Sequence, residues 1–264
     1  MNNEFPMIKI DGEQINPQNH IEPGSGLMLF IAFFIAIIGT LVGVLFTYGI
    51  LLIVFLLYPL FAWYVHKKAM ALIHGSGVIV NEYQFPEIHE CVITFKERLG
   101  ITKDISVYIV EDNVLNAMAV RYGKKNVILL TDDIVQGCLL SGNPQTLSFV
   151  IAHELAHISL NHNGLFHSWI GKHLKKLGRL DEYSADNVSS ALIGDTQIVY
   201  HGLLLLGIGY ALLPYVNHES ILKQAKEVAE NKYTKKAEKS LTHPLLFNRI
   251  YHVINKAQKS SSQI

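Results

Sequence analysis

The stretch Thr146-Leu-Ser-Phe-Val-Ile-Ala-His153-Glu154-Leu-Ala-His157-Ile-Ser-Leu160 decides how this chain is organised around its centre. It is long and largely apolar, so we predict a helix with three ionisable side chains near its middle. Residues four apart on a helix point the same way, offset by about 40° and about 6 Å of rise. His153 and His157 can therefore bind one metal ion together, which would remove the cost of burying them without partners.

Glu154 gives this pattern its chemical meaning. The spacing H-E-x-x-H is typical of the zinc-peptidase helix, in which the glutamate is the base for a water at the metal. The alternative is an ordinary helix whose two histidines have unrelated roles. A catalytic zinc also needs a third protein ligand and an open position for water, so we expect another ligand downstream.

Two downstream residues could supply the third ligand. His162 lies five positions after His157, about 140° further round a continuous helix, and an ordinary polar role is preferred for it. Glu182 is favoured instead, because Glu182 and Asp186 are four apart near the start of a predicted helix and share a face. One carboxylate can bind the metal while the other accepts the N–H of a ligating histidine. The alternative is an exposed acidic helix start.

Further sequence elements accompany the helix signature. Leu115-Asn-Ala-Met-Ala119 is similar to an N-A-F element, with Met118 in place of Phe, and Glu182-Tyr-Ser-Ala-Asp186 has the form E-x-x-A-D. Thr242-His-Pro-Leu-Leu-Phe-Asn-Arg-Ile250 is similar to an H-P-x-x-x-x-R-I element. In this order, over about residues 85–253, the four elements resemble the gluzincin metallopeptidases of the HtpX and CAAX-prenyl-endopeptidase type.

The resemblance implies a centre that holds one Zn²⁺ per chain. The implied zinc ligands are His153, His157 and Glu182. Glu154 would be the general base and proton carrier, and Asp186 would orient His153.

The resemblance also implies the outer parts of the site. His243 and Arg249 would lie near the metal and stabilise the developing oxyanion, as hydrogen-bond donors do in other peptidases. Asn116, Ala117 and Met118 would lie on an edge strand and line the substrate cleft. Met118 departs from the implied Phe, which affects the shape of that cleft and not the metal site.

The segment Leu27–Val65 has no charged residue. One membrane span needs about 20 apolar residues, so we predict two spans in a hairpin that turns near Phe46–Gly49. Lys67 and Lys68 follow the second span, and the positive-inside rule then places the N-terminus and the catalytic domain in the cytoplasm. The alternative is one long tilted span with a re-entrant remainder. The predicted location is the bacterial inner (plasma) membrane, as a multi-pass protein.

The predicted fold class is α+β: a mainly helical, zincin-like metallopeptidase domain with a small antiparallel sheet, preceded by a transmembrane helical hairpin. The expected divisions are a polar N-terminal tail (1–25), the hairpin (26–66), the peptidase domain (67–258) and a disordered C-terminus (259–264). The predicted strands are Ile105–Val110, Ala117–Arg121 and Asn126–Thr131. The apolar stretch Ile198–Val216 is expected to be a bent or buried helix, because a third span would put His243 on the opposite side of the membrane from His153.

Charge and cysteine content exclude some classes of protein. Lys and Arg total 22 and Asp and Glu total 22, which gives no basic footprint for nucleic acid. The two cysteines have no metal-binding spacing and indicate a reducing compartment.

The expected function is that of a membrane-anchored zinc endopeptidase, with a peptide or protein substrate and the lipid bilayer as partners. The resemblance suggests membrane-protein quality control. The alternatives are a CAAX-type processing peptidase and a zinc-binding chaperone or scaffold without catalysis.

Overall fold

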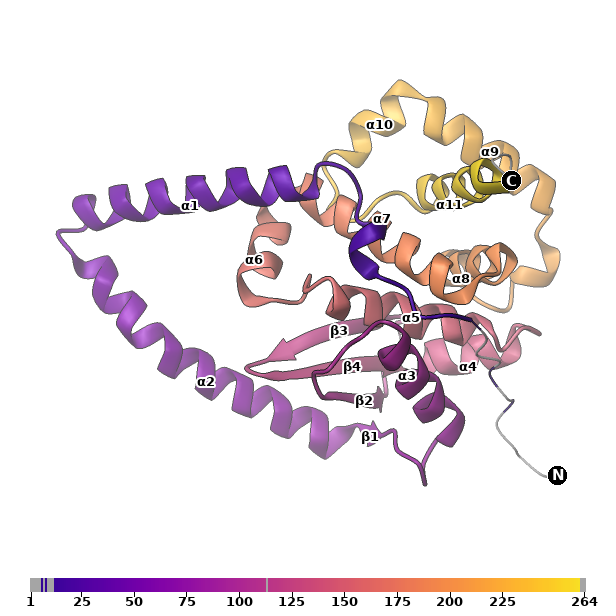
Figure 1. The fold of residues 1–264 in the computed structure, drawn as a ribbon, viewed down its shortest axis with the longest axis horizontal. Helices are drawn as coiled ribbons and strands as arrows, with labels where there is room; N and C mark the ends of the chain where they lie inside the picture. The colour runs from indigo at the N-terminus through magenta and orange to yellow at the C-terminus, as the bar shows by residue number, and fades with distance from the viewer. Residues whose placement is uncertain (1–5, 7, 9–11, 113, 262–264) are drawn as a thin grey trace.

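The computed structural model describes residues 6, 8, 12–112 and 114–261. Most of these residues are helical, and a small sheet lies beside the central helices (Figure 1). The α+β fold class is therefore confirmed. The predicted disordered end begins at residue 259, but the last helix continues to Ser261, and residues 262–264 lie outside the described part of the chain.

Helices α1 (Ser25–Phe46) and α2 (Ile50–Ser76) form the hairpin, and both are long and apolar enough to cross a membrane. The chain reverses at Thr47–Gly49, as predicted, and Gly49 has the positive φ of 84° that favours glycine. The two helices diverge from this turn toward the domain, where α1 packs against α7 and α2 lies along the sheet (Figure 1). Helix α2 continues ten residues beyond the predicted end of the hairpin at residue 66.

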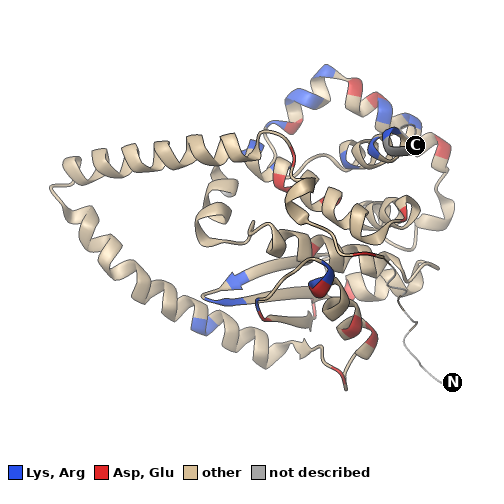
Figure 2. Cartoon of the chain, viewed as in Figure 1, with Lys and Arg blue, Asp and Glu red and all other residues tan. Residues whose placement is uncertain are grey.

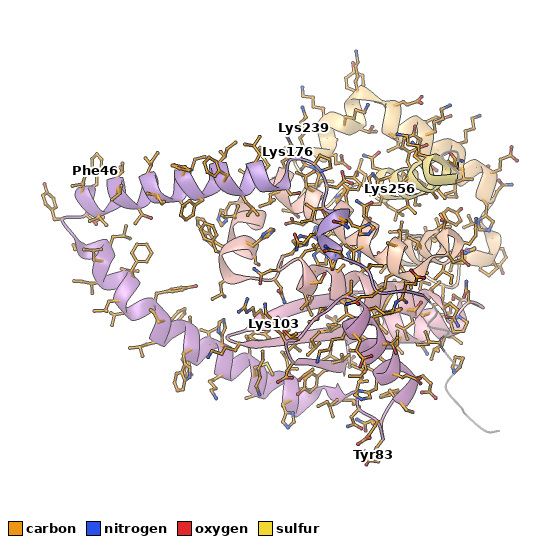
Figure 3. All side chains as sticks on the ribbon, viewed as in Figure 1. Phe46, Tyr83, Lys103, Lys176, Lys239 and Lys256 are labelled. Atoms are coloured by element: carbon orange, nitrogen blue, oxygen red, sulfur yellow. The ribbon has the colours of Figure 1, made fainter. Side chains whose placement is uncertain are left out.

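The hairpin surface is apolar on nearly every side. Figure 3 shows side chains on all sides of α1 and α2, with Phe46 near the tip of the hairpin. The charged residues of α2 are Lys67 and Lys68 in its second half, whereas charges are frequent on the C-terminal helices (Figure 2). A helix that is apolar all round and exposed needs an apolar solvent, and a bilayer supplies one.

The sheet contains β1 (Val78–Ile79), β2 (Ile105–Val110), β3 (Ala117–Tyr122) and β4 (Lys125–Thr131), in the order β1-β2-β4-β3. Strands β3 and β4 pair antiparallel through a tight hairpin, as predicted. Strands β2 and β4 pair in parallel, so the sheet is mixed and not purely antiparallel. The reason is topological: the chain leaves β2, forms β3 at the far edge and returns between them as β4.

The remaining helices surround α5 (Thr146–Ser159), whose residues are nearly all buried. Helix α5 contacts α3, α4, α7, α8 and β3, as its apolar sequence requires. The other helices are α3 (Pro86–Arg98), α4 (Asp132–Leu140), α6 (Leu165–His173), α7 (Lys175–Ile193), α8 (Thr196–Ile208), α9 (His218–Glu230), α10 (Lys232–Glu238) and α11 (Leu246–Ser261), with 3₁₀ turns η1 (Pro17–His20) and η2 (Leu213–Tyr215).

Helix α8 accounts for the apolar stretch that could have been a third span. It has 13 residues and ends at Ile208, where Gly209 takes a positive φ of 73°. That length is too short to cross a bilayer. Its buried face, which includes Leu203, Leu204 and Leu205, packs into the core of the domain.

Candidate metal centre

Helices α5 and α7 bring the three predicted metal ligands together. His153 and His157 project from α5, and Glu182 projects from α7, which packs against α5. The two Nε2 atoms of the histidines are 3.2 Å apart. Glu182 Oε2 lies 3.5 Å from His153 Nε2, and Glu182 Oε1 lies 3.6 Å from His157 Nε2.

These spacings fit a tetrahedral metal ion. Zinc bonds of roughly 2.0–2.1 Å in tetrahedral geometry place neighbouring ligand atoms about 3.3 Å apart. The 3.2 Å between the two Nε2 atoms is close to that value, and each Nε2 has one Glu182 oxygen at 3.5 or 3.6 Å. Two buried imidazole nitrogens that face each other and a carboxylate are also a donor set that a divalent cation satisfies.

The electrostatics of the site favour a cation. Burial opposes a positive charge on His153, but the Asp186 and Glu182 carboxylates outweigh it and raise the pKa of His153 to about 9. Burial lowers the pKa of His157 to about 4. For Glu182, burial opposes ionisation, but His153, His157 and Arg249 hold its pKa well below the usual range. The carboxylate therefore stays ionised between the two imidazoles.

Asp186 contacts the far side of His153. Its Oδ1 lies 3.1 Å from His153 Nδ1, and the carboxylate is fully buried. Asp186 thus lies where a residue that orients His153 would lie, and its orienting role stays a prediction. Burial raises the cost of ionising Asp186, but the Arg249 guanidinium and His153 lower its pKa to about 2.

Arg249 lies behind the ligands. It donates two hydrogen bonds to Asp186, from Nε to Oδ2 at 2.8 Å and from Nη2 to Oδ1 at 2.7 Å. Its Nη1 is 3.6 Å from Glu182 Oε2. The guanidinium thus fixes both carboxylates of α7, and its role toward an oxyanion stays a prediction.

His243 lies on the loop between α10 and α11, at the open side of the site. Its Nε2 is 3.4 Å from Glu182 Oε1, and its side chain is 70% exposed. Gly178 allows this loop to approach α7, because a Cβ at that position would lie 2.9 Å from the carbonyl oxygen of Thr242. The resemblance predicts that His243 lies near the metal. In the structure His243 lies next to the predicted ligand Glu182.

Glu154 and β3 form the other wall of the site. The Glu154 carboxyl is buried, which raises its pKa to about 7, and it is hydrogen-bonded to the backbone of Ala119. Ala117 and Met118 belong to β3, the edge strand that packs on α5. The backbone N–H and C=O of Asn116, just before the strand, pair with the Thr131 hydroxyl at 3.1 and 2.9 Å. Their contact with a substrate stays a prediction.

The sequence interpretation missed a second group beside the first. His162, His167 and Asp181 lie close enough together to hold a metal ion. His162 reaches this place because α5 ends at Ser159 and Asn161 takes a positive φ of 59°, which turns the chain back. On a continuous helix, His162 would instead lie about 140° away from His157. The run Asn161-His162-Asn163-Gly164, rich in residues that end helices, was the available signal.

The fold and the site are those expected of a metallopeptidase. Two histidines and a glutamate on packed helices could hold a metal ion, with a buried glutamate beside them, and residues 82–169 match Peptidase family M48. This match includes α5 and ends before Glu182.

A curated relative is more specific: the chain is similar to a "Protease HtpX homolog" of Methanocaldococcus jannaschii, with 27% identity over 131 residues. The match covers 49% of this chain and 44% of the relative. The resemblance to HtpX-like M48 membrane metallopeptidases is therefore confirmed.

Proposed function

We propose that the chain is a membrane-anchored zinc endopeptidase that hydrolyses peptide bonds. One observation carries this proposal: the Nε2 atoms of His153 and His157 lie 3.2 Å apart and each lies within 3.6 Å of a Glu182 oxygen, with Glu154 buried beside them. A purely structural zinc site would be closed by a fourth ligand and would need no base. The glutamate therefore favours catalysis over a scaffold role.

In the proposed reaction, His153, His157 and Glu182 bind the metal. Asp186 holds His153 in place, and Arg249 holds Glu182 in place. When bound, Zn²⁺ would lower the pKa of a water and polarise the peptide carbonyl. The Glu154 carboxylate takes the proton from the attacking water and delivers it to the leaving amine nitrogen.

The open side of the site would receive the substrate. An extended peptide could pair with the free edge of β3, next to Asn116, Ala117 and Met118. His243 is exposed at this side and could donate to the developing oxyanion. Arg249 would affect the oxyanion indirectly, because it contacts Glu182 and Asp186 and sets their positions.

The hairpin supports a membrane location. We propose that α1 and α2 cross the inner membrane and that Lys67 and Lys68 keep the domain on the cytoplasmic side. Substrates would then be membrane proteins or peptides near the bilayer, which agrees with a quality-control role. A CAAX-type chamber would need many spans, and the described residues supply two candidates.

The test compares wild type with Glu154→Gln, both full-length and purified in detergent. We expect one zinc per chain in each and casein cleavage that falls by about 10²–10⁴-fold in the variant, because the general base is lost. Glu219→Gln, on the exposed surface of α9, is the matched control and should cleave like wild type.

Two outcomes would contradict the proposal in different ways. Zinc in both proteins with cleavage in neither would indicate a binding scaffold. Absence of zinc from both would overturn the metal centre built on His153, His157 and Glu182.

A further inference from the structure

The second histidine group contacts the first directly. His162 Nδ1 lies 3.0 Å from His157 Nδ1, on the side of the His157 ring that faces away from Glu182. His162 Nε2 lies 3.4 Å from Asp181 Oδ1, and His167 Nε2 lies 2.8 Å from Asp181 Oδ2. His162 is 9% exposed and Asp181 is 6% exposed, so this chain of contacts is sheltered from water.

The positions of the ring hydrogens distinguish the two uses of this group. A His157 that binds a metal through Nε2 must carry its hydrogen on Nδ1. That N–H points at His162 Nδ1, which must then accept, and the His162 hydrogen must be on Nε2. His162 Nε2 faces Asp181 Oδ1, an oxygen that makes no hydrogen bond with any residue that the structure describes.

A metal bound by His162 Nε2 would require the opposite placement of the hydrogen on the His162 ring. The His162 hydrogen would move to Nδ1 and face the N–H of His157 across 3.0 Å, which is repulsive. A metal at the second group and a metal at the first therefore exclude each other through the shared contact. The unpartnered oxygen of Asp181 fits an N–H donor from His162 instead.

We infer that His162 and Asp181 are positioning residues that hold His157 in its metal-binding tautomer and orientation. This inference rests on the proposed zinc site. The arrangement parallels the Asp186 contact with His153, with one imidazole inserted between carboxylate and ligand. Each histidine of the zinc pair thus has a buried carboxylate behind it. His167 anchors Asp181 from the other side and does not contact His157.

The test measures zinc affinity and not activity. Full-length variants in detergent are titrated with zinc against a competing chelator, and zinc per chain is counted at saturation. His162→Ala should bind one zinc per chain about 10–100-fold more weakly than wild type, as when other outer partners of a ligating histidine are removed. His162→Asn should recover most of the affinity, because its amide oxygen can accept where Nδ1 accepted.

His167→Ala is the matched control within the same group. It removes a partly buried histidine that bonds Asp181 and for which the described residues show no contact with His157, so its zinc affinity should change less than that of His162→Ala. Thermal unfolding of the metal-free proteins shows whether each variant folds. If His162→Ala does not fold, Asp181→Asn tests the same chain of contacts from Asp181 through His162 to His157.

Three outcomes would overturn the inference. Two zinc ions per wild-type chain, one of them lost in His167→Ala, would make this group a second metal site. Unchanged affinity in His162→Ala would show that His157 needs no such support. Wild type that binds no zinc would instead overturn the proposed function, which separates the two failures.

Discussion

Arg249 is a single residue on which two buried carboxylates depend. It makes two hydrogen bonds to Asp186 and lies 3.6 Å from Glu182. Removing one partner of a buried ion pair leaves an uncompensated charge in a poor solvent for it. We therefore expect Arg249 to contribute to the stability of the folded chain.

We expect Arg249→Met to lower the Tm of the metal-free protein by roughly 6–12 °C, which corresponds to about 3 kcal/mol or more. The Tm of Arg249→Lys should lie between those of wild type and Arg249→Met, because lysine keeps the charge but cannot make the paired hydrogen bonds. Thermal unfolding in a chelator, at one scan rate, measures both. Arg121→Met, at a partly exposed arginine of β3, is the control. Equal Tm values for wild type and Arg249→Met would show that Asp186 and Glu182 do not need this cation.

Individual residues differ in how well the sequence predicts their place. Helix periodicity alone puts His153 and His157 on one face, so their spacing in the sequence was enough to predict that they lie together. Glu182 needed the resemblance as well, because nothing local distinguishes it from an acidic helix start. The contact of His162 with His157 depends on how the chain turns after α5, and the two hydrogen bonds of Arg249 depend on where α11 docks. Neither is encoded by local spacing.

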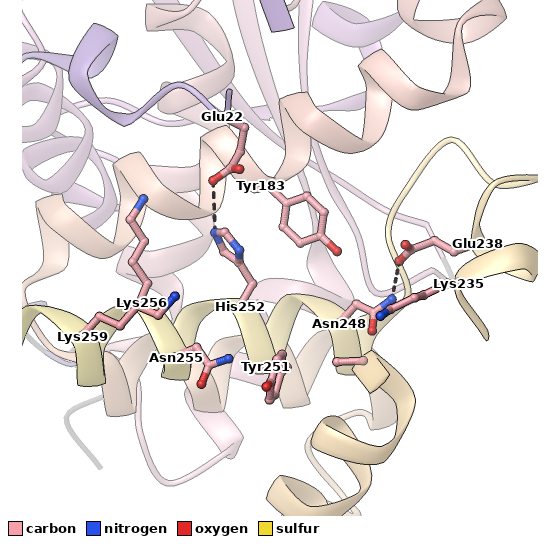
Figure 4. A pocket seen from close by; sticks show the side chains of 11 residues that line it. Glu22, Tyr183, Lys235, Glu238, Asn248, Tyr251, His252, Asn255, Lys256 and Lys259 are labelled. Carbon is pink, nitrogen blue, oxygen red and sulfur yellow. Dashed lines mark hydrogen bonds and ion pairs between the residues drawn. The ribbon is translucent and has the colours of Figure 1, made fainter. Parts of the chain in front are cut away.

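The segment before α1 is an element with a defined place, although its sequence looked like a polar tail. Glu22 accepts a hydrogen bond from the Asn187 side chain at 2.7 Å and lies 3.3 Å from His252 Nε2. The Glu22 backbone N–H donates to the Ser184 hydroxyl at 2.9 Å. Figure 4 shows the Glu22–His252 pair at a pocket of about 490 Å³ that is lined mainly by α11, with residues of α7, α9 and α10. These contacts connect α1 to both helices.

The same contacts predict a dependence of stability on pH. The hydrogen bond with His252 lowers the pKa of Glu22 below its ordinary value of 4.5. A depressed pKa stabilises the folded state above that ordinary value, and the contribution is lost as the pH falls through the folded pKa. The Tm of wild type should therefore fall more steeply below about pH 4.5 than that of Glu22→Gln. Glu219→Gln, which lacks these contacts, should follow wild type.

Parallel Tm curves for wild type and Glu22→Gln would contradict this prediction. They would mean that the segment before α1 contributes the same stability whether Glu22 is charged or neutral.

At the scale of the whole molecule, the hairpin places the turn and the domain on opposite sides of the proposed membrane. Tyr48 in the turn is 97% exposed and Tyr83 in the domain is 89% exposed. Cys91 and Cys138 are fully buried, and burial raises the pKa of Cys138 to about 12. Both native thiols should therefore resist labelling, and cysteines introduced at the two tyrosines can report the topology.

In intact cells we expect a membrane-impermeant maleimide to label Tyr48→Cys and not Tyr83→Cys. Tyr83→Cys should react only after the membrane is opened. Wild type, with its two buried cysteines, is the control for background labelling. Reversed labelling would invert the proposed orientation, and labelling of both in intact cells would favour a single span with a re-entrant remainder.

The overall architecture was predictable where it depends on local composition. The hairpin and the strands β2, β3 and β4 follow from apolar length and alternation in the sequence. The parallel pairing of β2 with β4 was not predictable, because periodicity identifies a strand but does not choose its neighbour. The length of α2 beyond the hairpin was missed for a related reason, since its last turns are held by contacts with the sheet.

The order of these parts along the chain has a consequence for synthesis. The ribosome makes the hairpin before α5 and α7, and it makes Arg249 after them, since Arg249 follows Asp186 by 63 residues. Until α11 arrives, burying Asp186 against α5 leaves its charge without a cation and is unfavourable. The group of charged residues at this site is therefore completed only after α11 has been made. A partly made chain that stops before α11 does not yet carry the assembled site.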